Sequence, residues 1–150
     1  MPQSRWMMSF VIFASTVACR DTTAPPERIS ASFVLETVSG QPLPAILFSE
    51  PTRTLTVVSS TLTLTMDGHA FMSESHRDDS QGIVTTPTFT ATLDYRLHGD
   101  QIEIGSFTPC PIGAFCLENA TGTLSNGTLT LKNPLPAPNK VYFYGPALLS

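Results

Sequence analysis

The chain has 150 residues, of which 8 are Lys or Arg and 12 are Asp or Glu, so its formal net charge is −4 at pH 7. A sparsely charged, mildly acidic protein attracts neither the phosphates of nucleic acid nor an anionic lipid surface, so we expect no nucleic-acid partner. The 13 Pro and 9 Gly residues lie between short apolar alternations rich in Thr, which is typical of an all-β protein.

A short apolar segment, Trp6–Ala18, follows Arg5 and ends at Cys19. As a helix, its roughly 13 residues would span about 20 Å, which is too short to cross the hydrocarbon core of a membrane. We therefore interpret residues 1–18 as a removable secretory signal. Two alternatives stay open: cleavage near Ala18 that leaves Cys19 as an ordinary thiol, and a cytoplasmic protein with an apolar first helix.

The residues Thr16-Val17-Ala18-Cys19 resemble the lipobox of bacterial lipoproteins, although Thr16 stands where that family usually has Leu. The resemblance implies that Cys19 receives a diacylglyceryl group and that signal peptidase II cuts before it. It also implies an outer-membrane destination, because Arg20 stands where Asp would favour retention in the inner membrane. We thus expect an exported protein anchored to the envelope membrane through Cys19.

The two remaining thiols, Cys110 and Cys116, form an even pair in a chain that we expect to be exported. Such a pair usually forms a disulfide, here around the short loop Pro111–Phe115, with a stabilisation of about 2 kcal/mol. A redox or metal role is less favoured, because redox pairs prefer two intervening residues and zinc needs further ligands.

Residues 19–28 contain Pro25-Pro26 and no apolar periodicity, which predicts an extended tether. Residues 29–150 then carry strand patterns and fit one domain. Thr88–Leu97 alternates for ten residues without a phase slip, and Asp67-Gly68 and Asn126-Gly127 are tight-turn signals. The predicted strands are an opening one around Phe33–Glu36, then Pro42–Phe48, Thr54–Val58, Ser60–Met66, Ala70–Arg77, Thr88–Leu97, Gln101–Ile104, Ala120–Leu124, Thr128–Lys132 and Val141–Tyr144.

These elements predict an antiparallel up-and-down meander of about 8–10 strands that closes into a small barrel, because closure removes the exposed edges of such a sheet. Alternation leaves open whether the barrel is packed or lines a ligand cavity. The side chains expected to face inward are Phe33, Leu35, Leu62, Leu64, Met66, Phe71, Phe89, Leu93, Tyr95, Ile102, Ile104, Leu129, Leu131 and Phe143.

Four stretches, Phe33–Pro44, Leu62–Gly68, Tyr95–Ile104 and Gly122–Leu131, together resemble the bacterial lipocalin-like lipoprotein domains. These are small exported barrels of the calycin type. True lipocalins carry a Gly-x-Trp motif in the first strand, whereas the only Trp of this chain is Trp6. The resemblance implies a lipocalin-like barrel and suggests ligand carriage.

One cluster of acid–base or metal-ligating residues stands out in the sequence, formed by His69, Glu74, His76, Asp78 and Asp79. Glu74 and His76 share one face of a strand, whereas His69 falls on the other. With no third ligand identifiable, we favour a solvated outer face beside a mobile polar loop at residues 78–82. No hydrolase, protease or nucleotide-binding motif occurs, so we expect no catalytic residue, no metal and no cofactor.

Three functional hypotheses follow. The leading one is a non-enzymatic envelope lipoprotein whose barrel binds a small apolar ligand or a protein partner. The second is a structural or inhibitory interaction protein with a packed barrel that acts through loops at Asp78–Thr86, Cys110–Cys116 and Asn133–Asn139. The least favoured is an enzyme that uses the region around His76.

Overall fold

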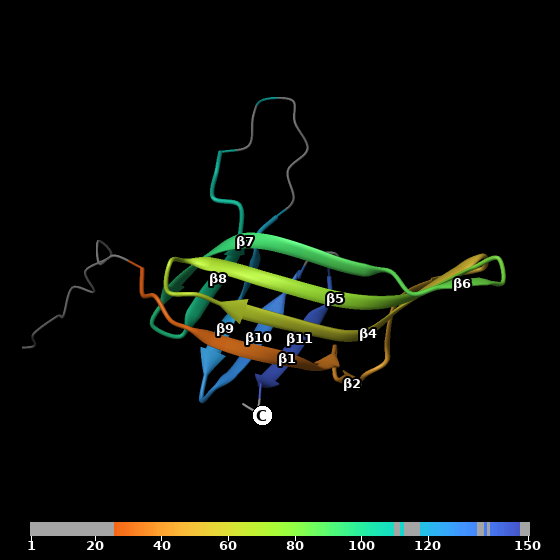
Figure 1. Cartoon of the computed structure of the whole chain (residues 1–150), viewed down its shortest axis with the longest axis horizontal. Coiled ribbons are helices and arrows are strands. Elements are labelled where there is room, and N and C mark those ends of the chain that lie inside the picture. The colour runs from red at the N-terminus through yellow and green to blue at the C-terminus, as the bar shows by residue number, and fades with distance from the viewer. Residues whose placement is uncertain (1–25, 110–111, 113–117, 135–136, 138, 148–150) are drawn as a thin grey trace, which may run out of the picture.

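The computed structural model describes residues 26–109, 112, 118–134, 137 and 139–147. These residues form eleven strands and no helix, in one antiparallel sheet that closes as an eight-stranded barrel (Figure 1). The expected all-β meander barrel is therefore confirmed. The strands are β1 (Ala31–Val38), β2 (Gln41–Pro42), β3 (Ala45–Glu50), β4 (Arg53–Leu64), β5 (His69–Ser80), β6 (Ile83–Thr85), β7 (Thr88–His98), β8 (Gln101–Gly105), β9 (Ala120–Ser125), β10 (Thr128–Lys132) and β11 (Val141–Pro146).

The barrel wall runs in the order β1, β11, β10, β9, β8, β7, β5 and β4, and β4 pairs again with β1. β4 is long enough to pair with β1 through Thr61–Leu64 and with β3 through its first half. A bulge at Val58 separates these halves, so the two strands expected at residues 54–58 and 60–66 are one bent strand.

Turn residues fix the register of the hairpins. Asn126 and Gly127 have φ values of 51° and 77°, as the predicted two-residue turn requires. At the predicted Asp67-Gly68 turn only Gly68 has a positive φ, of 93°, and its N–H bonds to the carbonyl oxygen of Thr65. This longer turn moves the start of β5, which decides which of its residues face inward.

Four strand segments extend beyond the barrel as a smaller sheet, which we call the projecting sheet (Figure 1). It consists of β3, residues 53–57 of β4, residues 76–80 of β5, and β6. The polar loop expected at residues 78–82 is therefore wrong: β5 continues to Ser80, and only Gln81 and Gly82 form the turn into β6.

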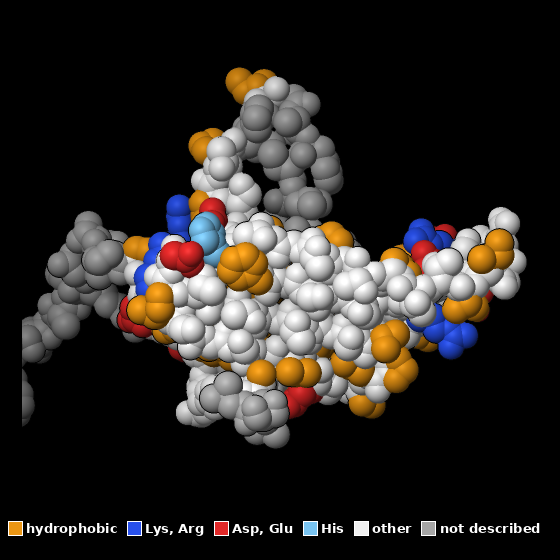
Figure 2. Space-filling view, in the orientation of Figure 1, with side chains coloured by type: hydrophobic (Ala, Val, Ile, Leu, Met, Phe, Trp, Pro, Cys, Tyr) orange, Lys and Arg blue, Asp and Glu red, His pale blue; other side chains and the backbone are white. Residues whose placement is uncertain are grey.

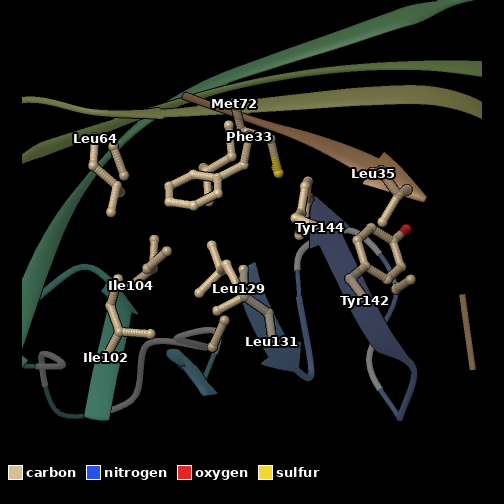
Figure 3. Packing of buried hydrophobic residues seen from close by; sticks show 14 of the residues in the cluster. Phe33, Leu35, Leu64, Met72, Ile102, Ile104, Leu129, Leu131, Tyr142 and Tyr144 are labelled. Atoms are coloured by element: carbon tan, nitrogen blue, oxygen red, sulfur yellow. The ribbon is translucent and has the colours of Figure 1, made fainter. Parts of the chain in front are cut away.

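Apolar side chains from opposite walls meet inside the barrel. Figure 3 shows Phe33, Leu64 and Met72 on one side facing Ile104 and Leu129 on the other. The interior apolar side chains are at most 6% exposed, so they pack against one another. Those predicted correctly are Phe33, Leu35, Leu62, Leu64, Tyr95, Ile102, Ile104, Leu129 and Leu131, while Leu93 is partly buried against the core.

Three inward assignments were wrong. Met66 lies in the turn after β4 and Phe71 is on the outer face, because the longer turn places Ala70 and Met72 inward. In β11 the three consecutive aromatic residues allow either phase, and the inward side chains are Tyr142 and Tyr144, beside the half-buried Phe143. Phe89 has the inward phase that the alternation predicted, because it pairs with the inward-facing Glu74, but it is 37% exposed at a position of β7 that lies beyond its pairing with β8.

One end of the barrel is closed by residues that we expected in the tether or at its boundary. Glu27 pairs with Leu97, and Arg28 lies over the Tyr95 ring at 5.5 Å and donates to the Tyr95 carbonyl oxygen. The Tyr95 hydroxyl accepts from the N–H of Ile29 at 2.8 Å. The domain therefore begins at or before Glu27. Among the described residues, no helix has the length and apolar character needed to cross a membrane.

Candidate functional site

A polar cluster lies inside the barrel, next to the base of the projecting sheet. It is centred on Glu74 and His76 of β5, two residues that are 0% and 6% exposed. The solvated outer face expected for this pair is therefore wrong. The reason is strand phase: Ala70, Met72, Glu74 and His76 form one alternating set, and the apolar members of that set face the core.

Hydrogen bonds connect the pair to the opposite wall. Glu74 Oε1 contacts His76 Nε2 and accepts from the Tyr142 hydroxyl at 3.2 Å. Close by, the Ser60 and Tyr144 hydroxyls lie 3.2 Å apart. Within the described part of the chain, the buried Glu74 Oε2 has no hydrogen-bond partner. The cluster thus joins β4, β5 and β11 through polar contacts inside an otherwise apolar core.

Burial controls the ionisation of this cluster. Loss of solvent raises the pKa of the Glu74 carboxyl above its usual value, and contacts with His76, Tyr142 and Ser60 only partly oppose the rise. Burial also raises the pKa of the Tyr142 and Tyr144 hydroxyls far above their ordinary value, so both stay protonated. Glu74 is therefore more readily protonated, and so neutral, inside this cluster than it would be in water.

The other members of the sequence cluster lie elsewhere. His69 is on the outer face, where its Nδ1 is 2.9 Å from Asp94 Oδ1, and Asp79 lines a cleft on the outer face of the projecting sheet. Asp78 forms a bidentate ion pair with Arg53, in which both carboxylate oxygens accept from the guanidinium. This contact holds the pKa of Asp78 below its usual value. Among the described residues, no three His, Cys, Asp or Glu side chains are grouped to hold a metal.

Glu74 and His76 are enclosed in the barrel, where their buried polar contacts link β5 to β11. The sequence correctly predicted that Glu74 and His76 share one face of the strand. It wrongly predicted that this face points to solvent. The inward position could have been found from the sequence, because Glu74 and His76 alternate in phase with the apolar Ala70 and Met72. The prediction that Phe71 faces inward led to the opposite phase.

We predict that Glu74→Gln stabilises the protein at pH 8 and has little effect near pH 4. A carboxyl group whose pKa is raised by folding contributes stability that is present in full at low pH. This contribution is lost as the pH rises through the pKa of the folded state. Glutamine stays neutral and removes this loss, which amounts to about 1.4 kcal/mol for each unit by which folding raises the pKa of Glu74. Urea unfolding at both pH values measures it, with Glu50→Gln at an exposed position of β3 as control. Equal effects of Glu74→Gln at both pH values would contradict the account.

A cleft lies on the outer face of the projecting sheet. Its volume is about 610 Å³, and its lining is Pro44, Thr54, Thr56, Val58, Arg77, Asp79 and Thr86. The exposed Ile46 pairs with Thr56, and the exposed Val84 pairs with Asp79, so both lie on this same face. We call this cleft the outer groove. It combines exposed aliphatic side chains with a cation and an anion.

Cys19, Cys110 and Cys116 lie outside the described residues, as does the segment interpreted as a signal peptide. Lipidation of Cys19 and the disulfide therefore stay predictions. In comparisons with protein-family models, with curated proteins and with solved structures, the chain finds no match. The likeness to lipocalin-like lipoprotein domains is thus also a prediction.

Proposed function

We propose that this protein is a non-enzymatic envelope lipoprotein, anchored through a lipid on Cys19, whose barrel presents the outer groove to a protein partner. The observation that carries the proposal is the filled interior. Leu129, Tyr142 and Tyr144 are fully buried among their neighbours, and the described clefts of about 610, 320 and 290 Å³ open on the outside. This supports recognition at the surface over carriage of a small apolar ligand.

The chemistry of the outer groove fits a protein partner. Protein interfaces combine apolar contacts with arginine, and the groove brings Ile46, Val58 and Val84 together with Arg77. In Figure 2 the projecting end shows hydrophobic and charged side chains side by side. The stacking of Arg53 on Phe48 at 5.3 Å, with its ion pair to Asp78, ties three strands of the projecting sheet together on its other face.

Site-specific crosslinking in the exporting cell tests the proposal. We expect a photoreactive residue at Thr56 to give one discrete crosslinked protein, and the same residue at the exposed Thr121 of β9 to give none. Val58→Asp should abolish the Thr56 crosslink, whereas Val34→Asp, at an exposed valine outside the groove, should leave it unchanged. Loss of the crosslink with both variants, or crosslinking from both positions, would contradict the proposal.

The anchor supplies a separate prediction. Cys19→Ser should abolish labelling by a fatty-acid analogue and release the protein from the membrane fraction, because a serine hydroxyl does not accept the lipid that the lipobox resemblance implies. Metabolic labelling followed by fractionation measures both outcomes. Equal labelling of the variant and the natural protein would remove Cys19 as the anchor. Placement in the outer membrane follows from Arg20 and is tested by separating the two membranes.

For Cys110 and Cys116, we predict a disulfide, because an oxidising compartment pairs spare thiols. Thiol titration of denatured, unreduced protein should find neither residue reactive. Two titratable thiols would show that the loop between them is not crosslinked.

A further inference from the structure

The outer face of the barrel bears an uncharged array of hydroxyl groups on neighbouring strands. Register places Thr61, Ser73 and Thr90 in one row across β4, β5 and β7, and Thr63, Phe71 and Thr92 in the next. Ser59, Ser75 and Thr88 form a third row, and Ser32 extends the second onto β1. We call this surface the hydroxyl face; its middle is largely white in Figure 2, because it carries almost no charged or apolar side chain.

A shallow cleft lies in the centre of the hydroxyl face, around Phe71. Its volume is about 320 Å³, and its lining includes Thr61, Thr63, Ser73, Thr90 and Thr92. This volume is near the lower end of the range for small-molecule sites. Phe71 is 45% exposed, and the His69 ring meets it edge-on at a centroid distance of 6.4 Å. Since Asp94 holds His69 at 2.9 Å, the position of the exposed phenyl ring is supported from one side.

Several of these hydroxyls are free to bind a ligand. Ser32 and Thr63 lie within hydrogen-bond distance of each other, as do Ser75 and Thr88. Within the described part of the chain, the hydroxyls of Thr61, Ser73, Thr90 and Thr92 make no side-chain hydrogen bond. Each hydroxyl both donates and accepts, so the face matches a ligand that carries many hydroxyls of its own.

The composition of the hydroxyl face separates it from the outer groove. Protein interfaces are enriched in aromatic residues and arginine and depleted in serine, whereas this face has one phenylalanine among many serines and threonines. An anionic ligand has no cation to meet in this cleft, since none of its lining residues is Lys or Arg. A neutral carbohydrate fits this face, because it carries many hydroxyls and no charge. Its ring face packs on an aromatic side chain while its hydroxyls form hydrogen bonds with those of the protein.

We propose that the hydroxyl face binds a neutral polysaccharide, with a sugar ring packed on Phe71 and its hydroxyls bonded to the threonines of β4 and β7. Phe71 then provides the apolar contact, and His69 acts as a positioning residue for that ring. This binding is independent of the outer groove, which lies on the projecting sheet. A lipid-anchored barrel with both surfaces would hold a protein partner and a glycan at the same time.

Titration with cellohexaose, an uncharged glucose oligomer, tests the proposal by NMR of the labelled mature domain. We expect saturable shifts at Thr61, Ser73 and Thr90 at millimolar sugar. Phe71→Ala should weaken binding by about tenfold or more. Phe89→Ala removes a second exposed phenylalanine, at 37% against 45% for Phe71, which lies on the face of β7 opposite Thr90 and Thr92, and should leave the affinity unchanged.

Thr92→Val provides a second variant that keeps the shape of the strand and removes one hydroxyl. It should weaken cellohexaose binding without lowering the midpoint of urea unfolding. The proposal is overturned if no saturable shift is seen with cellohexaose or with an N-acetylglucosamine hexamer, or if Phe71→Ala and Phe89→Ala reduce affinity equally. It is also overturned if a photoreactive residue at Thr90 crosslinks a protein while both sugars fail to bind.

Discussion

Replacement of His76 by alanine is expected to lower the free energy of unfolding by about 3–5 kcal/mol at pH 8. His76 contacts the carboxylate of Glu74 inside the barrel, and both side chains are buried. Without the imidazole, Glu74 keeps the Tyr142 hydroxyl, at 3.2 Å, as its hydrogen-bond partner within the described part of the chain. A carboxylate with so few partners in an apolar interior is costly when charged, so the loss should be greatest where Glu74 is ionised.

The pH dependence of this loss identifies its cause. As pH falls towards 4, Glu74 takes up a proton and the charge is removed, so the destabilisation by His76→Ala should shrink. In a Glu74→Gln background the same substitution should cost much less, because no buried charge is uncovered. Urea unfolding of the four proteins at pH 8 and pH 4 measures both effects. An equal loss at both pH values and in both backgrounds would mean that His76 contributes packing alone.

The second large effect concerns the phase of β4. Leu62 is 1% exposed and faces Phe33 across the β1–β4 pairing that closes the barrel, while the neighbouring Thr61 is exposed. Leu62→Ala should cost about 2–5 kcal/mol, because it removes buried apolar atoms and leaves a cavity. Thr61→Ala should stay within about 0.5 kcal/mol, as exposed substitutions usually do.

Paired urea melts of these two variants check the strand phase directly. A large loss for Thr61→Ala with little change for Leu62→Ala would mean that the strand is shifted by one residue, which exchanges its two faces. Large losses for both would mean that β4 is covered on both sides at this point, which a single-walled barrel does not allow.

Strand phase was readable from the sequence where alternation ran without interruption. In β7, Tyr95 and Leu97 are buried and Thr92, Asp94 and Arg96 are exposed, as the ten-residue alternation predicted. The hairpin at Asn126-Gly127 was equally predictable, because both residues adopt a positive φ. Such local signals predicted hairpins of the barrel, whereas the direct pairing of β1 with β4 that closes it was not predicted.

Phase was not readable where a bulge or a longer turn intervenes. The turn before β5 has its positive φ at Gly68 only, and this difference of turn type reversed the expected faces of Phe71 and Met72. The same error placed Glu74 and His76 on the outside. In β11, three aromatic residues in succession gave no alternation to read, and tertiary packing selected Tyr142 and Tyr144 for the core.

The candidate surfaces depend on long-range pairing that no local pattern contains. The outer groove needs residues 54–58 of β4 beside residues 77–79 of β5, and the extension of β5 beyond Arg77 was predicted as a polar loop. The hydroxyl face needs the registers of three strands at once. Alternation predicted that threonines would face outward, but only the sheet shows that they form rows.

The central claim is that the barrel is filled by its own side chains and acts through its outer surface. Native mass spectrometry of the mature domain, exported behind a cleavable signal without the lipid anchor, tests this most directly, because such a protein meets envelope lipids without carrying one covalently. We predict the mass of the bare polypeptide. A stoichiometric adduct of lipid size that survives purification and is lost on unfolding would contradict the claim.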